Sequence, residues 1–351
     1  MSKNQNSIRT AESVSPGHPD KLCDQISDAI VDAYLAKDPQ ARVAIDVAGG
    51  HGAVFVTGEV SSRVEVNIAK IVRRIAGKNS EVIERVAEQS PEIARGVNAG
   101  GAGDQGIMIG YACNETPELL PLEVVLARRL NQSLYQRWPY DGKTQVSVRG
   151  REIVAVVASF QHAPYDELEQ AVKDWVRNEA VRYVGVKYFA ETQTEHQMNN
   201  AVIQNIDPIL HINPAGDWKI GGFDADAGLT GRKLAVDNYG PRIPLGGGAF
   251  SGKDPSKVDR SAAYMARKIA IDYLRRFHAG EVLVRLAYAI GYDQPIETTA
   301  IVDGVLRKIT GYDLTPNGII EALDLRRPIY EQTARYGHFG QAGFSWESYE
   351  G

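Results

Sequence analysis

One order of secondary structure recurs three times along the 351-residue chain, and it constrains the fold more than any other feature of the sequence. Each time, an amphipathic helical stretch precedes two strand-like runs around a tight turn, and a second helical stretch follows. Hairpins flanked by helices are typical of α+β layers and not of a doubly wound parallel sheet. No residue identities repeat between the copies, so the alternative to three similar domains is a chance order within an α+β chain.

The three copies occupy most of the chain. The first comprises a helix over 20–37, strands over 42–48 and 53–61 around the glycine-rich turn 49–52, and helices over 64–76 and 81–89. The second comprises a helix over 121–138, strands over 144–149 and 152–162, and a helix over 165–182. The third comprises a helix over 257–277, strands over 281–290 and 297–303, and a helix over 316–323.

Charge and composition argue against several classes of protein. The chain carries 39 Lys and Arg against 44 Asp and Glu, a net charge of -5, which argues against generic nucleic-acid binding. Residues 1–10 are polar, so no secretory signal is expected, and the longest apolar run, 153–160, is too short to span a bilayer. The distant Cys23 and Cys113 predict neither a disulfide framework nor a metal site. We therefore expect a cytoplasmic protein with no nucleic-acid or membrane partner.

Four glycine- and charge-rich segments interrupt the regular pattern. The first, residues 15–21, places Pro19 in the first turn of a predicted helix, with His18 and Asp20 at its N-terminus. Free N–H groups there favour anions, and a carboxylate beside them suggests a metal ion held between Asp20 and a phosphate. From this segment alone the favoured alternative is structural: His18 caps the helix and Asp20 stabilises its first turn.

The second and third segments fit known loop motifs only in part. Residues 101–106 (GAGDQG) satisfy the dinucleotide fingerprint, but a strand over 107–112 follows where a helix is required. They form either a plain glycine turn or a backbone that approaches a ligand closely, with Asp104 toward it. Residues 221–233 lack the closing glutamate of an EF-hand. Arg232 and Lys233 are expected to open a strand there, and a solvated hairpin is the alternative.

The fourth segment, residues 246–260, suits a phosphate without being a standard P-loop. Asp254 stands where that motif requires Ser or Thr. Free backbone N–H groups and two ammonium groups precede a predicted helix, and Asp259 could hold a cation beside a phosphate. From 232 to 260, six basic residues (Arg232, Lys233, Arg242, Lys253, Lys257, Arg260) face three acidic ones (Asp237, Asp254, Asp259), a balance of +3. A flexible basic loop is the alternative.

Together these segments resemble the signatures of the S-adenosylmethionine synthetase, or methionine adenosyltransferase, family. GHPDK (17–21), GAGDQG (101–106), GLTGRK (228–233) and GGGAFSGKDPSKVDR (246–260) occur in the family's order, and the resemblance spans residues 10–339. It implies three similar α+β domains with mixed and antiparallel sheets in a pseudo-threefold arrangement, expected at 7–98, 102–219 and 221–350. It also implies a homodimer, or a homotetramer built as a dimer of dimers, with active sites at the subunit interface.

The resemblance implies a transferase reaction between ATP and L-methionine. The methionine sulfur attacks C5′ of ATP, S-adenosylmethionine forms, and the bound triphosphate is hydrolysed to pyrophosphate and phosphate. Since the sulfur is itself the nucleophile, the protein must position the substrates and stabilise charge on the triphosphate. The implied cofactors are two Mg²⁺ ions per site and K⁺.

The motif positions carry implied roles. The implied catalytic residues are His18 (at the ribose–triphosphate oxygen), Lys143, Arg232 and Lys253. The implied ATP-binding residues are His18, Asp141, Lys143, Trp218, Asp226, Arg232, Lys233 and Lys253. The implied methionine-binding residues are Glu59, Asp104, Asp226 and Lys257. The implied metal ligands are Asp20 and Asp259 for Mg²⁺ and Asp46 for K⁺.

The sequence departs from common family members at several positions. Asp46 stands where a glutamate potassium ligand is usual, and Gly100 stands where many members have a glutamine that contacts methionine. Trp218 replaces a phenylalanine against adenine, a change that preserves stacking. The segment 90–100, normally a mobile gate over the site, is short, which predicts faster exchange or looser choice among methionine analogues.

Two other functions stay open on the sequence alone. A polyphosphate or nucleoside triphosphate hydrolase would use the same cations and metals without a methionine pocket, whereas Glu59, Asp104 and Asp226 favour one. A regulatory nucleotide-binding subunit would have a degraded site, whereas the expected Asp, Lys and His residues are present apart from the changes at 46 and 100.

Overall fold

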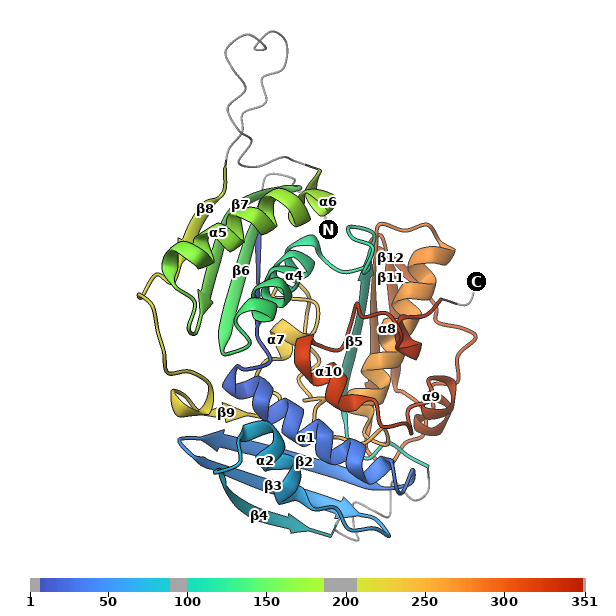
Figure 1. Ribbon diagram of the computed structural model, residues 1–351. Helices are drawn as coiled ribbons and strands as arrows, with labels where there is room; N and C mark the ends of the chain where they lie inside the picture. The colour runs from blue at the N-terminus through green and yellow to red at the C-terminus, as the bar shows by residue number, and fades with distance from the viewer. Residues whose placement is uncertain (1–6, 89–99, 186–206, 350–351) are drawn as a thin grey trace.

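The computed structural model describes residues 7–88, 100–185 and 207–349, which contain three four-stranded sheets (Figure 1). The first has the order β4 (Glu81–Ala87), β3 (Ala53–Ser61), β2 (Arg42–Gly50), β9 (Gly228–Leu229). The second has the order β1 (Ile8–Val14), β6 (Gly142–Arg149), β7 (Glu152–Phe160), β8 (Ile209–Ile212). The third has the order β12 (Val305–Arg307), β11 (Glu297–Val302), β10 (Glu281–Tyr288), β5 (Gly106–Cys113).

A predicted antiparallel pair of strands lies at the centre of each sheet, and helices flank it, so the threefold recurrence of the pattern is confirmed. The helix before each pair is α1 (Pro19–Leu35), α4 (Leu122–Arg137) or α8 (Val258–Arg276). The helix after it is α2 (Ile68–Ala76), α5 (Tyr165–Trp175) or α9 (Pro316–Ala322). A π-helical stretch (Val176–Ala180) and α6 (Val181–Val184) extend α5.

Each sheet also contains a strand from a different third of the chain. β1 pairs with β6, β5 with β10, and β9 with β2, all antiparallel. Each of these strands precedes the first helix of its own third and joins the sheet of another third, so the exchange runs in a cycle. The fourth strand of each sheet is local. β4 and β8 follow crossover helices and run parallel to their neighbours, whereas β12 follows a tight turn and runs antiparallel.

Two predictions about local structure were wrong. Residues 81–89 were expected to be helical, but 81–87 form β4, an edge strand whose backbone pairs in parallel with β3. Arg232 and Lys233 were expected to open a strand, but they directly precede the one-turn helix α7 (Leu234–Asp237). The predicted helix at 64–76 begins only at Ile68, because the Asn67 side chain caps it by accepting a hydrogen bond from the Lys70 N–H.

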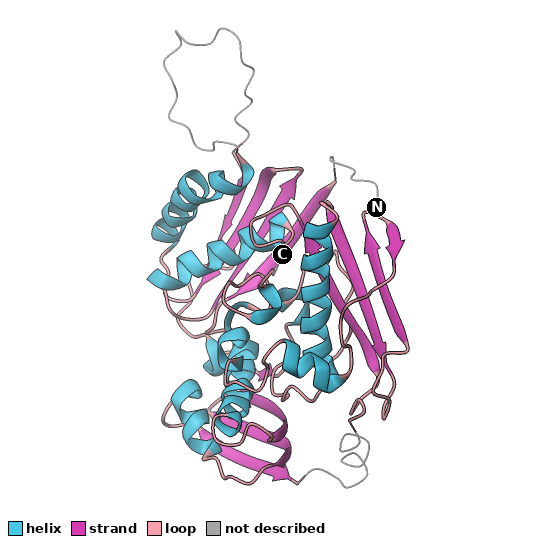
Figure 2. Ribbon diagram, turned by 90° about the vertical axis from the view of Figure 1, so that its right-hand side faces the viewer, coloured by secondary structure: helices cyan, strands magenta, loops and turns pink. Residues whose placement is uncertain are grey.

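The helices gather on one side of the strands in each sheet (Figure 2). In β2 the buried positions alternate, so Val43, Ile45 and Val47 belong to the core that also contains Ile26 and Ile30 of α1. A second core lies between the central sheet and the helices α4 and α5. Among the described residues, no helix is long and apolar enough to cross a membrane.

Candidate active site

The N-terminus of α1 holds the first group of candidate residues, and the predicted cap is confirmed. Pro19 begins the helix, and the His18 Nδ1 accepts a hydrogen bond of 3.1 Å from the Asp20 backbone N–H. The His18 side chain is mostly buried. This burial, with Lys233 next in importance, lowers the pKa of His18 to about 4. Since Nδ1 is an acceptor in a neutral ring, the proton lies on Nε2, which is left as a donor.

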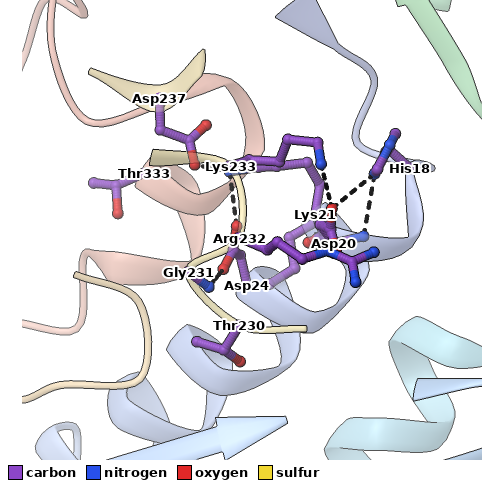
Figure 3. Close-up of polar contacts among 12 residues, drawn as sticks. His18, Asp20, Lys21, Asp24, Thr230, Gly231, Arg232, Lys233, Asp237 and Thr333 are labelled. Carbon is purple, nitrogen blue, oxygen red and sulfur yellow. Dashed lines mark hydrogen bonds and ion pairs between the residues drawn. The ribbon is translucent and has the colours of Figure 1, made fainter. Parts of the chain in front are cut away.

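Asp20 is fully buried beneath this cap and accepts hydrogen bonds from β9 and the loop after it (Figure 3). Its Oδ1 accepts from the Leu229 N–H at 3.0 Å and pairs with the Arg232 Nε at 2.8 Å, and its Oδ2 pairs with the Lys233 ammonium. Burial alone would raise the pKa of Asp20, but the bonds from Lys233 and Leu229 outweigh it and lower that pKa. The structure therefore brings His18, Asp20, Arg232 and Lys233 together.

A buried ion-pair network lies directly behind this group (Figure 3). The Lys21 Nζ lies 2.7 Å from Asp237 Oδ2 and 3.1 Å from Asp24 Oδ2, and all three side chains are almost completely buried. Asp24 Oδ1 accepts a hydrogen bond of 2.8 Å from the Gly231 N–H. Burial raises the pKa of Asp24 to about 6, against the opposing effect of Lys21. The sequence prediction missed this network.

Two more predicted residues approach the same helix end from the central sheet. Lys143 lies at the start of β6, and its charge helps to lower the pKa of His18. It also forms an ion pair of 2.6 Å with Glu12. Asp141 Oδ2 accepts the Gly222 N–H at 3.0 Å, and burial raises the pKa of Asp141. Asp226 is exposed, and its negative charge opposes the lowering of the His18 pKa.

Trp218 lies half-buried beside the start of the same loop. Its backbone carbonyl accepts the His162 N–H at 2.9 Å. A Cβ on Gly221 would lie 2.8 Å from its ring, so glycine permits the loop to pass this close to Trp218.

The loop from Gly246 to Lys257 forms a second group. The Lys253 ammonium pairs with Asp259 Oδ2, and the Lys257 Nζ lies 3.0 Å from Asp254 Oδ2. Asp254 also accepts the Val43 N–H at 2.7 Å, which ties the loop to the edge of β2. A Cβ at Gly248 would lie 2.2 Å from Asp259 Oδ1, so the glycines let the backbone run directly over this carboxylate.

The other predicted residues lie on β2, on β3 and in the loop before β5. Glu59 on β3 is paired in register with Ala44, and Ala44 forms a β-bridge with Lys253. Asp46 is exposed on β2, opposite Thr57. Asp104 is exposed in the loop before β5. Of the predicted gate, residues 90–99 lie outside the described residues.

No hydrogen bond or ion pair among the described residues joins the side chains of the first group to those of the second. The same residues contain no cluster of three or more His, Cys, Asp or Glu side chains that could hold a metal by themselves. Asp20 and Asp259 instead offer one carboxylate each, beside the cations Lys233 and Lys253. That donor set fits Mg²⁺, which is commonly bound through one or two carboxylates together with substrate phosphates.

Sequence reasoning also missed residues that fix these loops. Arg260 of α8 is fully buried and pairs with both oxygens of Asp28 at 2.8 and 2.7 Å. Asp28 accepts the Gly252 N–H at 2.9 Å. A signal was available: aspartates at positions 20, 24, 28 and 32 share one face of α1, where like charges repel unless they have partners.

Comparison with known proteins covers nearly the whole chain. Family models described as S-adenosylmethionine synthetase, N-terminal, central and C-terminal domain, match residues 6–91, 99–218 and 220–348. An S-adenosylmethionine synthase of Thermus thermophilus is 42% identical, over 96% of this chain and 95% of its own. The synthases of Brachyspira hyodysenteriae and Clostridium tetani are each 41% identical, over 99% and 97% of this chain and 97% and 96% of their own.

Proposed function

The chain belongs to the S-adenosylmethionine synthetase family and makes S-adenosylmethionine from ATP and methionine; on this premise we propose how its side chains divide the work. Sulfur attack at C5′ forms the S–C5′ bond and breaks the C5′–O bond, so negative charge develops on the departing triphosphate. The step needs cations and hydrogen-bond donors fixed in advance around that oxygen. Hydrolysis of the bound triphosphate to pyrophosphate and phosphate follows before release.

His18 is the donor to the leaving oxygen. The observation that carries this proposal is the hydrogen bond that Nδ1 accepts from the Asp20 N–H, because it leaves Nε2–H free to point at a ligand above the helix N-terminus. A ring with a lowered pKa stays neutral at pH 7, so it stabilises the oxyanion as a hydrogen-bond donor and not as a cation.

Lys143, Arg232, Lys233 and Lys253 hold the triphosphate. Asp20 and Asp259 would each hold one of two Mg²⁺ ions, and the ions would supply positive charge to the phosphate oxygens. These carboxylates also pair with Arg232, Lys233 and Lys253, so the cations are placed before ATP arrives. Asp141, Trp218 and Asp226 serve the adenosine part of ATP.

The methionine pocket combines Glu59, Asp104, Asp226 and Lys257. Glu59 takes the ammonium group, and the register of β3 against β2 supports its place beside the Lys253 loop. Asp46, exposed on β2, would hold K⁺ with one methylene fewer than the usual glutamate.

The active chain is a homodimer or a dimer of dimers with shared sites. Two observations support this: no hydrogen bond or ion pair among the described residues joins the side chains of the two groups of candidate residues, and strands of all three sheets expose apolar residues. These residues are Ile8, Phe55, Ile83, Ile107, Ile209, Leu229, Val305 and Leu306. Phe55 on β3 and Ile83 on β4 are paired in register, and exposed apolar side chains that lie together mark interaction sites. The cytoplasmic location and the domain limits 7–98, 102–219 and 221–350 stay predictions.

Product analysis tests the function. The chain is incubated with ATP, methionine and Mg²⁺, with and without K⁺, and S-adenosylmethionine, pyrophosphate and phosphate are quantified together. We expect one S-adenosylmethionine per pyrophosphate and phosphate, and a higher rate with K⁺. Release of phosphate without S-adenosylmethionine would instead indicate a triphosphate hydrolase.

A further inference from the structure

Four aspartates lie at successive turns of α1: Asp20, Asp24, Asp28 and Asp32. Residues four apart lie on one face of a helix, so these carboxylates form a row, here called the aspartate ladder. Like charges at this spacing destabilise a helix by themselves. The ladder therefore needs partners from other parts of the chain.

Each carboxylate of the ladder accepts backbone N–H groups from the last third of the chain. Asp20 accepts from Leu229 at 3.0 Å, Asp24 from Gly231 at 2.8 Å, and Asp28 from Gly252 at 2.9 Å. Asp32 accepts from Tyr330 at 2.9 Å and Glu331 at 2.8 Å, at the N-terminus of α10 (Tyr330–Tyr336). Four consecutive turns of one helix thus hold four points on distant segments.

The bond to Asp24 fixes the backbone next to two cations. Gly231 directly precedes Arg232 and Lys233, and Lys21 holds Asp24 from the other side at 3.1 Å. Both Lys21 and Asp24 are buried, so this anchor is shielded from water.

The bond to Asp28 fixes the backbone next to Lys253. Arg260 closes a clamp there: its Nη1 contacts Asp28 Oδ1 and the Lys253 carbonyl, both at 2.8 Å. On the other side the loop lies against β2, where a Cβ on Gly252 would stand 1.9 Å from the Ile45 carbonyl oxygen. The Lys253 backbone is therefore held between α1, α8 and β2.

We propose that Asp24 and Asp28 are positioning residues for triphosphate binding: Asp24 sets the loop of Arg232 and Lys233, and Asp28 with Arg260 sets the loop of Lys253. The inference rests on the proposed function, because these loops matter only if their cations hold the triphosphate. Asp32 provides a control within the ladder, because it has the same chemistry but anchors α10, which carries no candidate site residue.

The test compares Asp24→Asn, Asp28→Asn and Asp32→Asn in the full chain. Asparagine keeps the size and one acceptor but loses the charge, so at position 28 an amide faces the Arg260 donors. The measurements are kcat, KM for ATP, KM for methionine, Kd for tripolyphosphate with Mg²⁺, and the thermal midpoint. All three variants are expected to lower the midpoint.

Only the first two variants are expected to weaken polyphosphate binding. A hydrogen bond to a charged group is stronger than one to a neutral group by about tenfold in an equilibrium constant, so we expect the tripolyphosphate Kd and the KM for ATP to rise about tenfold. The KM for methionine is expected to stay within about twofold, as are all kinetic constants of Asp32→Asn. If Asp28→Asn destabilises folding too far, Asp28→Asn with Arg260→Gln removes both charges together and is expected to show the same Kd change.

The outcomes separate this inference from the proposed function. A wild-type chain that makes no S-adenosylmethionine overturns both. The proposed function stands if the wild-type chain makes S-adenosylmethionine and Lys253→Ala loses tripolyphosphate affinity. In that case this inference alone is overturned if Asp24→Asn and Asp28→Asn bind tripolyphosphate as tightly as Asp32→Asn does.

Discussion

In the His18 ring, Nδ1 caps the helix and Nε2 is the proposed donor to the leaving oxygen. One substitution can distinguish these two roles. Asparagine caps helices well, so His18→Asn keeps an acceptor for the Asp20 N–H and should change the free energy of unfolding by less than about 0.5 kcal/mol. It removes the Nε2–H donor, and kcat should fall about 10²- to 10³-fold. The measurements are steady-state kinetics and denaturant unfolding, and an unchanged kcat would refute the donor role.

Lys253 is one of the four cations proposed to stabilise the triphosphate, and its loss should weaken that stabilisation. In Lys253→Ala, removal of one fixed cation is expected to lower kcat/KM for ATP about 10²- to 10³-fold. Lys268→Ala is the matched control, because the Lys268 ammonium also pairs with an aspartate of α8, Asp272 at 2.7 Å, as Lys253 pairs with Asp259 of that helix. The control should retain kcat/KM, and equal losses in both variants would point to a general effect on α8.

A buried histidine predicts how stability depends on pH. Burial lowers the pKa of His338 well below its usual value near 6.5, with Arg260 acting in the same direction. Below about pH 6.5 the His338 ring takes up a proton in the unfolded chain but not in the folded chain. The free energy of unfolding therefore decreases as the pH falls below that value. The slope is about 1.4 kcal/mol per pH unit.

Comparison of wild type with His338→Asn isolates the contribution of His338 to the pH dependence of the unfolding free energy. Burial raises the pKa of Asp24 and Asp32 to about 6, and these groups act in the opposite direction between about pH 4 and 6. The quantity to measure is therefore the difference in unfolding free energy between wild type and His338→Asn, from denaturant titrations at pH 5 to 8. It should shrink as the pH falls below 6.5, whereas a constant difference would contradict the assignment.

At the scale of elements, β5 and α8 pack so closely that a methyl group decides whether they fit. A Cβ on Gly110 would lie 2.0 Å from the Ala266 carbonyl oxygen of α8. Gly110→Ala should therefore lower the free energy of unfolding by about 1–3 kcal/mol or more. Gly106→Ala, in the same strand, meets nothing nearer than 3.4 Å and should cost much less. Thermal unfolding of both variants checks this, and equal midpoints would argue against the close packing.

Local patterns predict the elements that local physics decides. The apolar stripe of α1, the turns of the central strand pairs and the cap at His18 depend on residues close in sequence. β4 was missed because Val82 and Val86, its half-buried residues, fit a helical spacing as well as a strand. Its strand form depends on pairing with β3, and a pairing partner is not encoded in a seven-residue window.

The sequence motifs predicted the candidate site residues but not the buried residues that hold their loops in place. The resemblance identified His18, Asp20 and the basic loop residues, and the structure brings His18, Asp20, Arg232 and Lys233 into contact. Arg260 was counted among the basic residues of 232–260, but its burial against Asp28 was not predicted, since the pair joins positions 232 apart in the sequence. The pair joins α1 to α8, and no periodicity within either helix reveals the other.

At the scale of the whole molecule, the exposed apolar pair of Phe55 and Ile83 on the first sheet predicts how copies associate. Phe55→Lys with Ile83→Lys places two charges on neighbouring strands of the first sheet, where both native side chains are 38% exposed. We expect the double variant to shift toward monomer and to lose activity with it. Tyr165→Lys, at the first residue of α5 and 47% exposed, is the control. Sedimentation velocity gives the oligomeric state, and unchanged association of the double variant would exclude this face.

The cyclic exchange of strands also bears on how the chain is synthesised. A ribosome releases α1 early, but Asp32 meets the Tyr330 N–H 298 positions later. At about 5–20 residues per second, that interval is about 15–60 s. For most of it the nascent first sheet lacks β9 and the ladder lacks its donors, so the N-terminal third cannot close on its own. The order of translation therefore makes the last third the segment that completes both the first and the third sheet, and a chain that terminates before β9 leaves its first domain unfinished.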